Sequence, residues 1–141
     1  MIRKSTDDDM DEILAIWLNA SIKAHDFIDA EYWRSQLDNM RNTYLPASET
    51  YVYESQAGLV GFYSLAGDTL AALFVSPAHQ GQGIGRALLS HAKTLRRQLR
   101  LSVYKENAAS CSFYLSQGFV VISEQPDEHT GHREYIMRTR P

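Results

Sequence analysis

The sequence predicts a single mixed α/β domain in which about four helices flank a mostly antiparallel sheet of about seven strands. Its apolar residues recur at helical spacing near the N-terminus and at every second position from Thr50 onward. Farther along, an apolar run of strand length leads through a glycine-rich turn into another helical pattern, which indicates one parallel strand–helix–strand unit. The 141 residues, 44% hydrophobic and 22% charged, suit one ordinary globular core. We therefore expect residues 1–141 to form one domain.

A short strand and two helices are expected before Thr50. Residues 2–4 can form the strand, and Thr6 with Asp9 makes a capping-box pattern at the start of the first helix. We expect the acidic residues 7–12 to be a solvated cap of that helix and not a metal site. A second helix, capped by Asp29, should end before Pro46. The inward faces are expected to contain Met10, Ile13, Leu14, Trp17, Leu18 and Ser21 in the first helix and Trp33, Leu37, Met40 and Tyr44 in the second.

The segment between these helices, residues 23–29, brings together His25, Asp26 and Phe27. Loops often carry binding residues, so this segment is a candidate lining for a pocket, with His25 as a polar contact or a base. Alternatively, His25 is satisfied by its neighbours while Phe27 and Ile28 hold the loop on the core. The sequence leaves both interpretations open.

The remaining strands are placed by alternation and by turn residues. A hairpin turn is expected at residues 56–58, and Pro77 should end the third strand of this half. The fourth is expected to run parallel to the third, because the helix between them allows a right-handed crossover. The predicted strands are residues 51–55, 59–65, 70–75, 99–103, 120–123 and 133–137.

Gly81, Gly83 and Gly85 occupy the turn between the third of these strands and the next helix. Glycine lets a backbone adopt unusual dihedrals and approach a ligand, and the helix start offers unpaired N–H groups, so the turn predicts a phosphate cradle. A nucleotide P-loop would need Lys and then Ser or Thr where Arg86 and Ala87 stand, and a dinucleotide fingerprint would need a glycine at Arg86. On this motif alone, a plain strand-to-helix turn is the alternative.

The pattern that remains is Gln80-x-x-Gly83-x-Gly85 after an apolar strand. It resembles the acetyl-coenzyme A motif Gln/Arg-x-x-Gly-x-Gly/Ala of the GNAT N-acetyltransferase superfamily. A second motif of that superfamily follows in the right order. It consists of Asn107 at a helix start, Phe113-Tyr114 and Gly118-Phe119. The chain is most similar to short stand-alone bacterial members, some of which are regarded as protein-lysine acetyltransferases.

The resemblance implies an enzyme that transfers acetyl directly from acetyl-coenzyme A (acetyl-CoA) to a primary amine, either a protein lysine or a small molecule. Backbone groups at Phe74 and Val75 would pair with the pantetheine arm, and an N–H near Phe74 would stabilise the oxyanion. Asn107 would hold the same arm or steady its helix. The pyrophosphate would bind at Gln80, Gly81, Gln82, Gly83, Ile84, Gly85 and Arg86.

The same resemblance makes Tyr114 the candidate general acid for the departing thiolate, although its helical spacing also suits a core aromatic. The general base stays unassigned, because residues 70–75 contain no acid. Its candidates are His25, Glu54, Asp68, Tyr63 through a water, or a chain of waters. The acceptor pocket is expected to include His25, Phe27, Tyr32, Trp33 and Tyr63.

Composition narrows the partners. The net charge of −3 argues against a nucleic-acid surface, including a tRNA acceptor. Cys111 is the single cysteine, which excludes an intrachain disulfide, and His129 and His132 lack a third metal ligand. No apolar run suits a membrane span or a signal peptide, so a cytoplasmic location is expected. A non-catalytic acyl-CoA-binding module is the alternative function, and both a monomer and a homodimer remain open.

Overall fold

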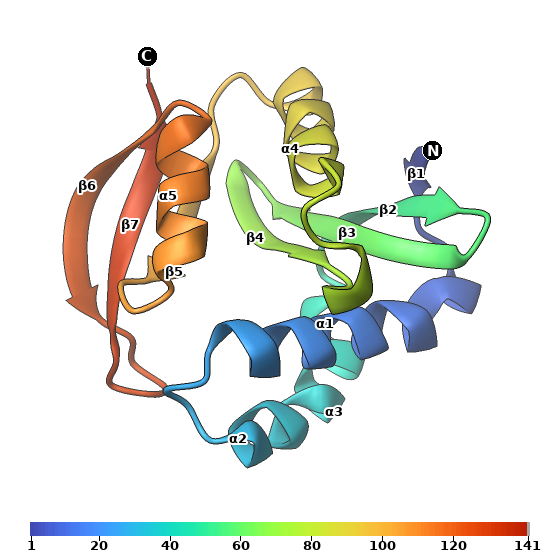
Figure 1. Ribbon diagram of the computed structural model, residues 1–141, viewed down its shortest axis with the longest axis horizontal. Coiled ribbons are helices and arrows are strands. Elements are labelled where there is room, and N and C mark those ends of the chain that lie inside the picture. Colours follow the sequence, from blue (N-terminus) through green and yellow to red (C-terminus); the bar gives the residue numbers. More distant parts are fainter. Residues whose placement is uncertain (141) are drawn as a thin grey trace.

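The computed structural model describes residues 1–140, which form one mixed sheet with helices on both faces (Figure 1). The strands are β1 (Ile2–Lys4), β2 (Glu49–Ser55), β3 (Gly58–Ala66), β4 (Thr69–Val75), β5 (Arg100–Tyr104), β6 (Phe119–Pro126) and β7 (Arg133–Thr139). The helices are α1 (Met10–Ala24), α2 (Ala30–Ser35), α3 (Leu37–Asn39), α4 (Ile84–Leu95) and α5 (Ala108–Ser116), with short turns η1 (Asp7–Asp9), η2 (Met40–Tyr44) and η3 (Pro77–His79).

The strand order of the sheet is β1-β2-β3-β4-β5-β7-β6. Every neighbouring pair is antiparallel except β4 and β5, which are parallel and joined by α4. The predicted fold class, a mostly antiparallel sheet with one parallel strand–helix–strand unit, is therefore confirmed.

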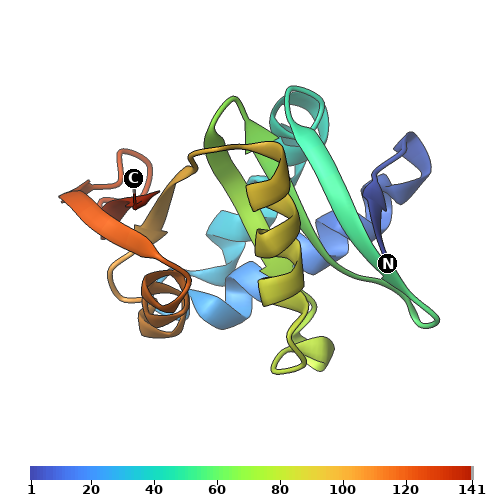
Figure 2. The same ribbon diagram turned by 90° about the horizontal axis from the view of Figure 1, so that it is seen from above.

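The parallel pair is short. β4 and β5 are in register only at Thr69 and Arg100, and the Arg100 N–H donates to the Asp68 carbonyl at 2.9 Å. Beyond this point the strands diverge, so the sheet has two halves, β1–β4 and β5–β7 (Figures 1 and 2). The carboxyl ends of the two strands consequently lie apart, with α5 beside β5.

Two hydrophobic clusters hold the helices on the sheet. On one face, α4 buries Leu88, Leu89 and Ala92 completely against a cluster that includes Tyr63 of β3. On the other face, α1 and α2 pack over a cluster that includes Phe62. Because successive strand residues point to opposite faces, adjacent residues of β3 serve different cores.

Two expectations for the N-terminal third need correction. The acidic run is not merely a solvated cap, because Asp9 is buried and accepts hydrogen bonds from both Arg3 guanidinium nitrogens at 2.8 and 3.0 Å. Glu12 also turns inward and accepts the Leu59 N–H at 3.1 Å. The single helix expected after Asp29 is divided at Gln36 into α2 and α3 and ends in the π-helical turn η2.

The closing hairpin of β6 and β7 is longer than the sequence predicted, and a register shift lies between Val121 and Ser123. Most of β6 is exposed at the sheet edge, so its outer residues gave no alternating pattern. None of the helices within residues 1–140 has the length and apolar character needed to cross a bilayer.

Candidate active site

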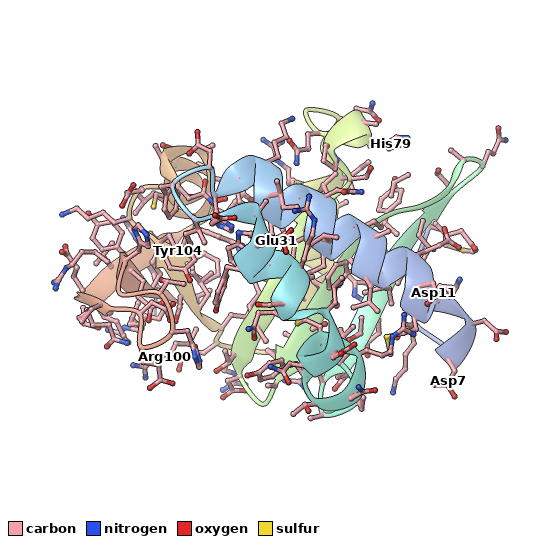
Figure 3. The ribbon with its side chains drawn as sticks, turned by 90° about the horizontal axis from the view of Figure 1, so that it is seen from below. Asp7, Asp11, Glu31, His79, Arg100 and Tyr104 are labelled. Atoms are coloured by element: carbon pink, nitrogen blue, oxygen red, sulfur yellow. The ribbon has the colours of Figure 1, made fainter. Side chains whose placement is uncertain are left out.

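A cavity of about 840 Å³ lies where β4 and β5 diverge. Its walls come from the end of α1, from β4, from the glycine-rich turn with the start of α4, and from the start of α5. A crevice at the carboxyl ends of parallel strands is the usual ligand position in α/β sheets. Figure 3 shows His79 on the turn after β4, and Asp7 and Asp11 at the N-terminal end of α1, away from Tyr104 of β5.

The glycine-rich turn has the conformation that a phosphate cradle requires. Gly81 and Gly83 have φ angles of +81° and +82°, in the left-handed region that other residues rarely adopt. Gly83 is the N-cap of α4, so the N–H groups of the first helical turn have no helical partner and face the cavity. Gly85 and Arg86 also line it, whereas the predicted Gln82 does not.

Gln80 connects the turn to two other walls of the cavity. Its Nε2 donates to the Val75 carbonyl at 3.1 Å, and its Oε1 accepts from Lys23 Nζ of α1 at 3.2 Å. Lys23 and Arg86 are therefore two basic side chains at the cradle, where an anion would be attracted. The sequence placed Lys23 in a loop segment and gave it no role.

The backbone edge of β4 that faces away from β3 belongs to Leu73 and Val75, and the Val75 carbonyl on it accepts from Gln80 Nε2. The Ser76 N–H donates to Val60 O at 2.8 Å, and the antiparallel register continues through Phe62 opposite Phe74. Hydrogen-bonded pairs alternate along such a ladder, so Phe74 bonds to β3. Leu73 and Val75 point their N–H and C=O groups at the cavity. The expectation that Phe74 supplies backbone groups is one residue out of register, although its side chain lines the cavity.

Tyr114 of α5 lines the cavity two helical turns after Asn107. Its ring packs against Phe113 and Phe119, and within residues 1–140 its hydroxyl has no hydrogen-bond partner. Burial raises the pKa of this hydroxyl above its ordinary value, so Tyr114 holds its proton throughout the neutral range. A protonated hydroxyl that faces a cavity can act as a general acid.

His25 is buried at the end of α1 and joined to Asn107. It stacks on Trp33 with ring centroids 5.0 Å apart, and Asn107 Nδ2 donates to His25 Nε2 at 3.3 Å. Asn107 Oδ1 accepts the Ser110 N–H at 3.2 Å, so the predicted N-cap is present. Burial lowers the pKa of His25 to about 4, and a hydrogen bond with the Ser21 backbone only partly raises it again. The imidazole is therefore neutral at pH 7.

The predicted acceptor-pocket residues are only partly brought together. Phe27, Trp33 and Tyr32 form an aromatic group around His25, beside the cavity but not on its wall. Tyr63 is fully buried on the other face of the sheet, where its hydroxyl bonds to His91 Nδ1 at 2.5 Å. The alternation of apolar residues at every second position placed Tyr63 on a strand, but it could not show which side chains of that strand reach the cavity.

None of the side chains named as possible bases lines the cavity. Glu54 is paired with Arg3 at 3.3 Å, and Asp68 lies on the exposed turn that starts β4, at the end opposite the cradle. Within residues 1–140, the one carboxylate on the cavity wall is that of Glu106, which no sequence motif marked. Its place directly after β5, at the carboxyl end of a parallel strand, was the available signal.

The sheet is split, with a phosphate cradle on one side of the split and a tyrosine on the other. This arrangement defines the protein as a group-transfer enzyme with a GNAT fold. A family model described as an acetyltransferase (GNAT) domain matches residues 46–121, which include both features. The chain belongs to this family of N-acetyltransferases.

Its relatives confirm the resemblance to small bacterial members. Peptidyl-lysine N-acetyltransferase YiaC of Escherichia coli is 35% identical over 97% of this chain and 94% of its own length. Peptidyl-lysine N-acetyltransferase YjaB of the same organism is 33% identical over 92% and 88%. The solution structure of apo YjaB has a TM-score of 0.86 at 30% identity, covering 98% of this chain and 95% of its own. PaiA N-acetyltransferase of Thermoplasma acidophilum, solved with coenzyme A, shares the fold, with a TM-score of 0.82 at 19% identity and coverage of 100% and 98%.

Proposed function

We propose that this protein transfers the acetyl group of acetyl-CoA to the side-chain amine of a protein lysine. The observation that carries the proposal is one continuous cavity that joins the phosphate cradle to Tyr114 inside a GNAT fold. YiaC and YjaB, which cover almost the whole chain, are named peptidyl-lysine N-acetyltransferases. The PaiA structure holds coenzyme A on the same fold.

The cavity fits the cosubstrate in size and chemistry. Its volume of about 840 Å³ is within the range of ligand clefts. The first-turn N–H groups of α4 would bind the pyrophosphate, with Lys23 and Arg86 offsetting its charge. The open edge of β4 at Leu73 and Val75 would pair with the pantetheine amides as an added strand. Asn107, whose side chain is occupied by Ser110 and His25, would steady the start of α5.

The chemistry proposed is direct attack of the amine on the thioester in a ternary complex. A backbone N–H from Leu73 or Val75 would stabilise the oxyanion, and holding both reactants in line would supply much of the acceleration. Cys111, the single cysteine, does not line the cavity. Burial raises the pKa of its thiol, and its Sγ lies 3.5 Å from the Tyr104 carbonyl, so it is unsuited to carry an acyl group.

Two measurements test this function. The first is thermal unfolding with acetyl-CoA, with ATP and NAD as controls; ligand at about 100 times its Kd should add roughly 2.7 kcal/mol of stability. The second is thiol release with a terminally blocked peptide that contains lysine, compared with the same peptide carrying arginine and with spermidine. No thermal shift with acetyl-CoA would overturn the proposal. A shift without thiol release would indicate a binding module, and release with spermidine alone would replace the lysine acceptor by a small amine.

A further inference from the structure

The proposed reaction needs a group that removes a proton from the acceptor. A lysine ammonium has an ordinary pKa of about 10.4, so roughly one molecule in a thousand is neutral near pH 7. His25 is buried, and none of its ring nitrogens faces the cavity wall. Among the Asp and Glu side chains of residues 1–140, Glu106 alone lines the cavity. His79 also lines the cavity, but it directly precedes Gln80 of the phosphate cradle. Glu106 is therefore the candidate base on the side of the cavity away from the cradle.

Glu106 occupies the point where β4 and β5 have separated. It follows β5 and directly precedes Asn107, the N-cap of α5, so its backbone is held by both elements. Its Oε1 lies 3.1 Å from Nδ1 of His132, and the side chains are 53% and 33% exposed. His132 packs edge-on against Phe27 with ring centroids 5.1 Å apart. The carboxylate thus lies between the cavity and the segment that joins α1 to α2.

The other charged groups near Glu106 are engaged elsewhere. Lys105, which follows β5, and Arg133 of β7 both pair with Glu124, at 3.4 and 2.8 Å. In the loop between β6 and β7, Asp127 accepts from Tyr104 Oη at 2.8 Å, and His129 faces Glu128.

On the α1 side, Lys23 is bound to Gln80 and His25 is neutral. Within residues 1–140, Glu106 has one side-chain partner, His132, and its Oε2 accepts no hydrogen bond. One oxygen is therefore held in place while the other is open to a cation.

We propose that Glu106 receives the ammonium of the acceptor lysine and acts as its general base, and that His132 is a positioning residue for the Glu106 carboxylate. The inference rests on the proposed function and extends it to the acceptor side of the cavity. It assigns a catalytic role to one residue that no motif of the sequence marked.

The step balances as follows. One N–H proton of the ammonium moves to Glu106, and the nitrogen lone pair forms the C–N bond to the acetyl carbon. The C–S bond then breaks, and the sulfur takes the proton of Tyr114. The nitrogen loses its second proton as the intermediate collapses, which restores Tyr114. Glu106 releases its proton to solvent, to which half of its side chain is open. The products are the amide, the free thiol and one proton.

The central experiment compares Glu106→Gln with wild type on the lysine peptide, and uses Glu128→Gln as the matched control. Glu128 is exposed, lies in the adjacent loop and does not line the cavity. Glu106→Gln should lower kcat by about 10²-fold, the scale of a general base, without changing the thermal shift produced by acetyl-CoA. The loss should appear in kcat and not in the peptide KM alone. Glu128→Gln should match wild type in both.

Two further variants separate catalysis from structure. Glu106→Ala should regain part of its turnover when formate or acetate is added, because a small carboxylate can enter the vacated space. His132→Ala should lower kcat, and His132→Asn, which retains an N–H donor, should recover most of the loss.

Turnover of Glu106→Gln within threefold of wild type would overturn the proposal. So would a change in the peptide KM alone, since the carboxylate would then bind the ammonium without taking its proton. Failure of wild type to release thiol with the lysine peptide would count against the proposed function itself, which is a different result.

Discussion

Replacing Tyr114 with Phe removes one hydroxyl from the cavity and keeps the ring that packs against Phe113 and Phe119. Because the hydroxyl has no hydrogen-bond partner within residues 1–140, its loss should change the free energy of unfolding by no more than about 0.5 kcal/mol. Because Tyr114 is assigned as the general acid, the loss of its hydroxyl should lower kcat by about 10²-fold, which corresponds to an activation free energy higher by roughly 2.7 kcal/mol. Stability and turnover should therefore separate in this variant.

The assay is thiol release at saturating acetyl-CoA and lysine peptide, together with thermal unfolding with and without acetyl-CoA. Burial raises the pKa of Tyr114, so the acid-competent, protonated form persists from about pH 6 to about pH 9. Wild-type kcat should show no loss at the basic end of this range from deprotonation of Tyr114. The variant should bind acetyl-CoA normally and stay slow at every pH.

Tyr63→Phe is the matched control, because Tyr63 is also a buried tyrosine with a raised pKa but does not line the cavity. Its hydroxyl bonds to His91, so the substitution leaves a ring nitrogen without its partner and should cost about 1–2 kcal/mol of stability. Turnover should stay at the wild-type level. Wild-type turnover in Tyr114→Phe, or an equal loss in both variants, would refute the assignment of Tyr114.

Three further outcomes follow from the structure. Gly83→Ala should lower the stability of the apoprotein by about 1–2 kcal/mol, which would be measured as a fall of several degrees in Tm. The cause is the φ angle of +82°, which alanine rarely adopts, and not crowding, because no atom lies within 4 Å of the added carbon. Gly85→Asp should leave the apoprotein folded, since its nearest neighbour is 3.7 Å away, and should abolish the thermal shift with acetyl-CoA because the carboxylate repels the pyrophosphate. Arg3 lowers the pKa of Asp9 to about 2, so the stability that this pair provides is present above about pH 4 and is lost as the pH falls toward 2. Asp9→Asn should therefore lower Tm at pH 7, and Tm of the variant should depend less on pH between about 4 and 2.

The features that the sequence predicted correctly are those decided by neighbouring residues. The N-cap at Asn107 depends on its own side chain and the Ser110 N–H three residues later. The positive φ of Gly83 and of Gly118, which follows α5, reflects the one residue type that tolerates it. Motifs of this kind describe a local backbone conformation, so the phosphate side of the cavity could be outlined before any tertiary contact was known.

The features that could not be predicted depend on pairing between distant segments. Alternation placed Phe74 on a strand, but the hydrogen-bonded edge of β4 depends on its register with β3, which no local pattern specifies. Glu106 and His132 are 26 residues apart and meet only because β5 pairs with β7. Asp9 looked like one of several solvated acids because its partner, Arg3, lies on β1, outside the helical segment that the acidic run begins.

The buried pair of His25 and Asn107 links the acceptor side of the cavity to the general acid. His25 is neutral and wedged against Trp33, so its Nε2 is a fixed acceptor for the Asn107 amide. Asn107 caps α5, and Tyr114 lies two turns along that helix on the cavity wall. The loop after α1 therefore determines where α5 begins and hence where the Tyr114 hydroxyl lies. A residue that looked like a base from its position in the sequence is better explained as the support that orients the acid, which leaves proton removal to the open carboxylate of Glu106.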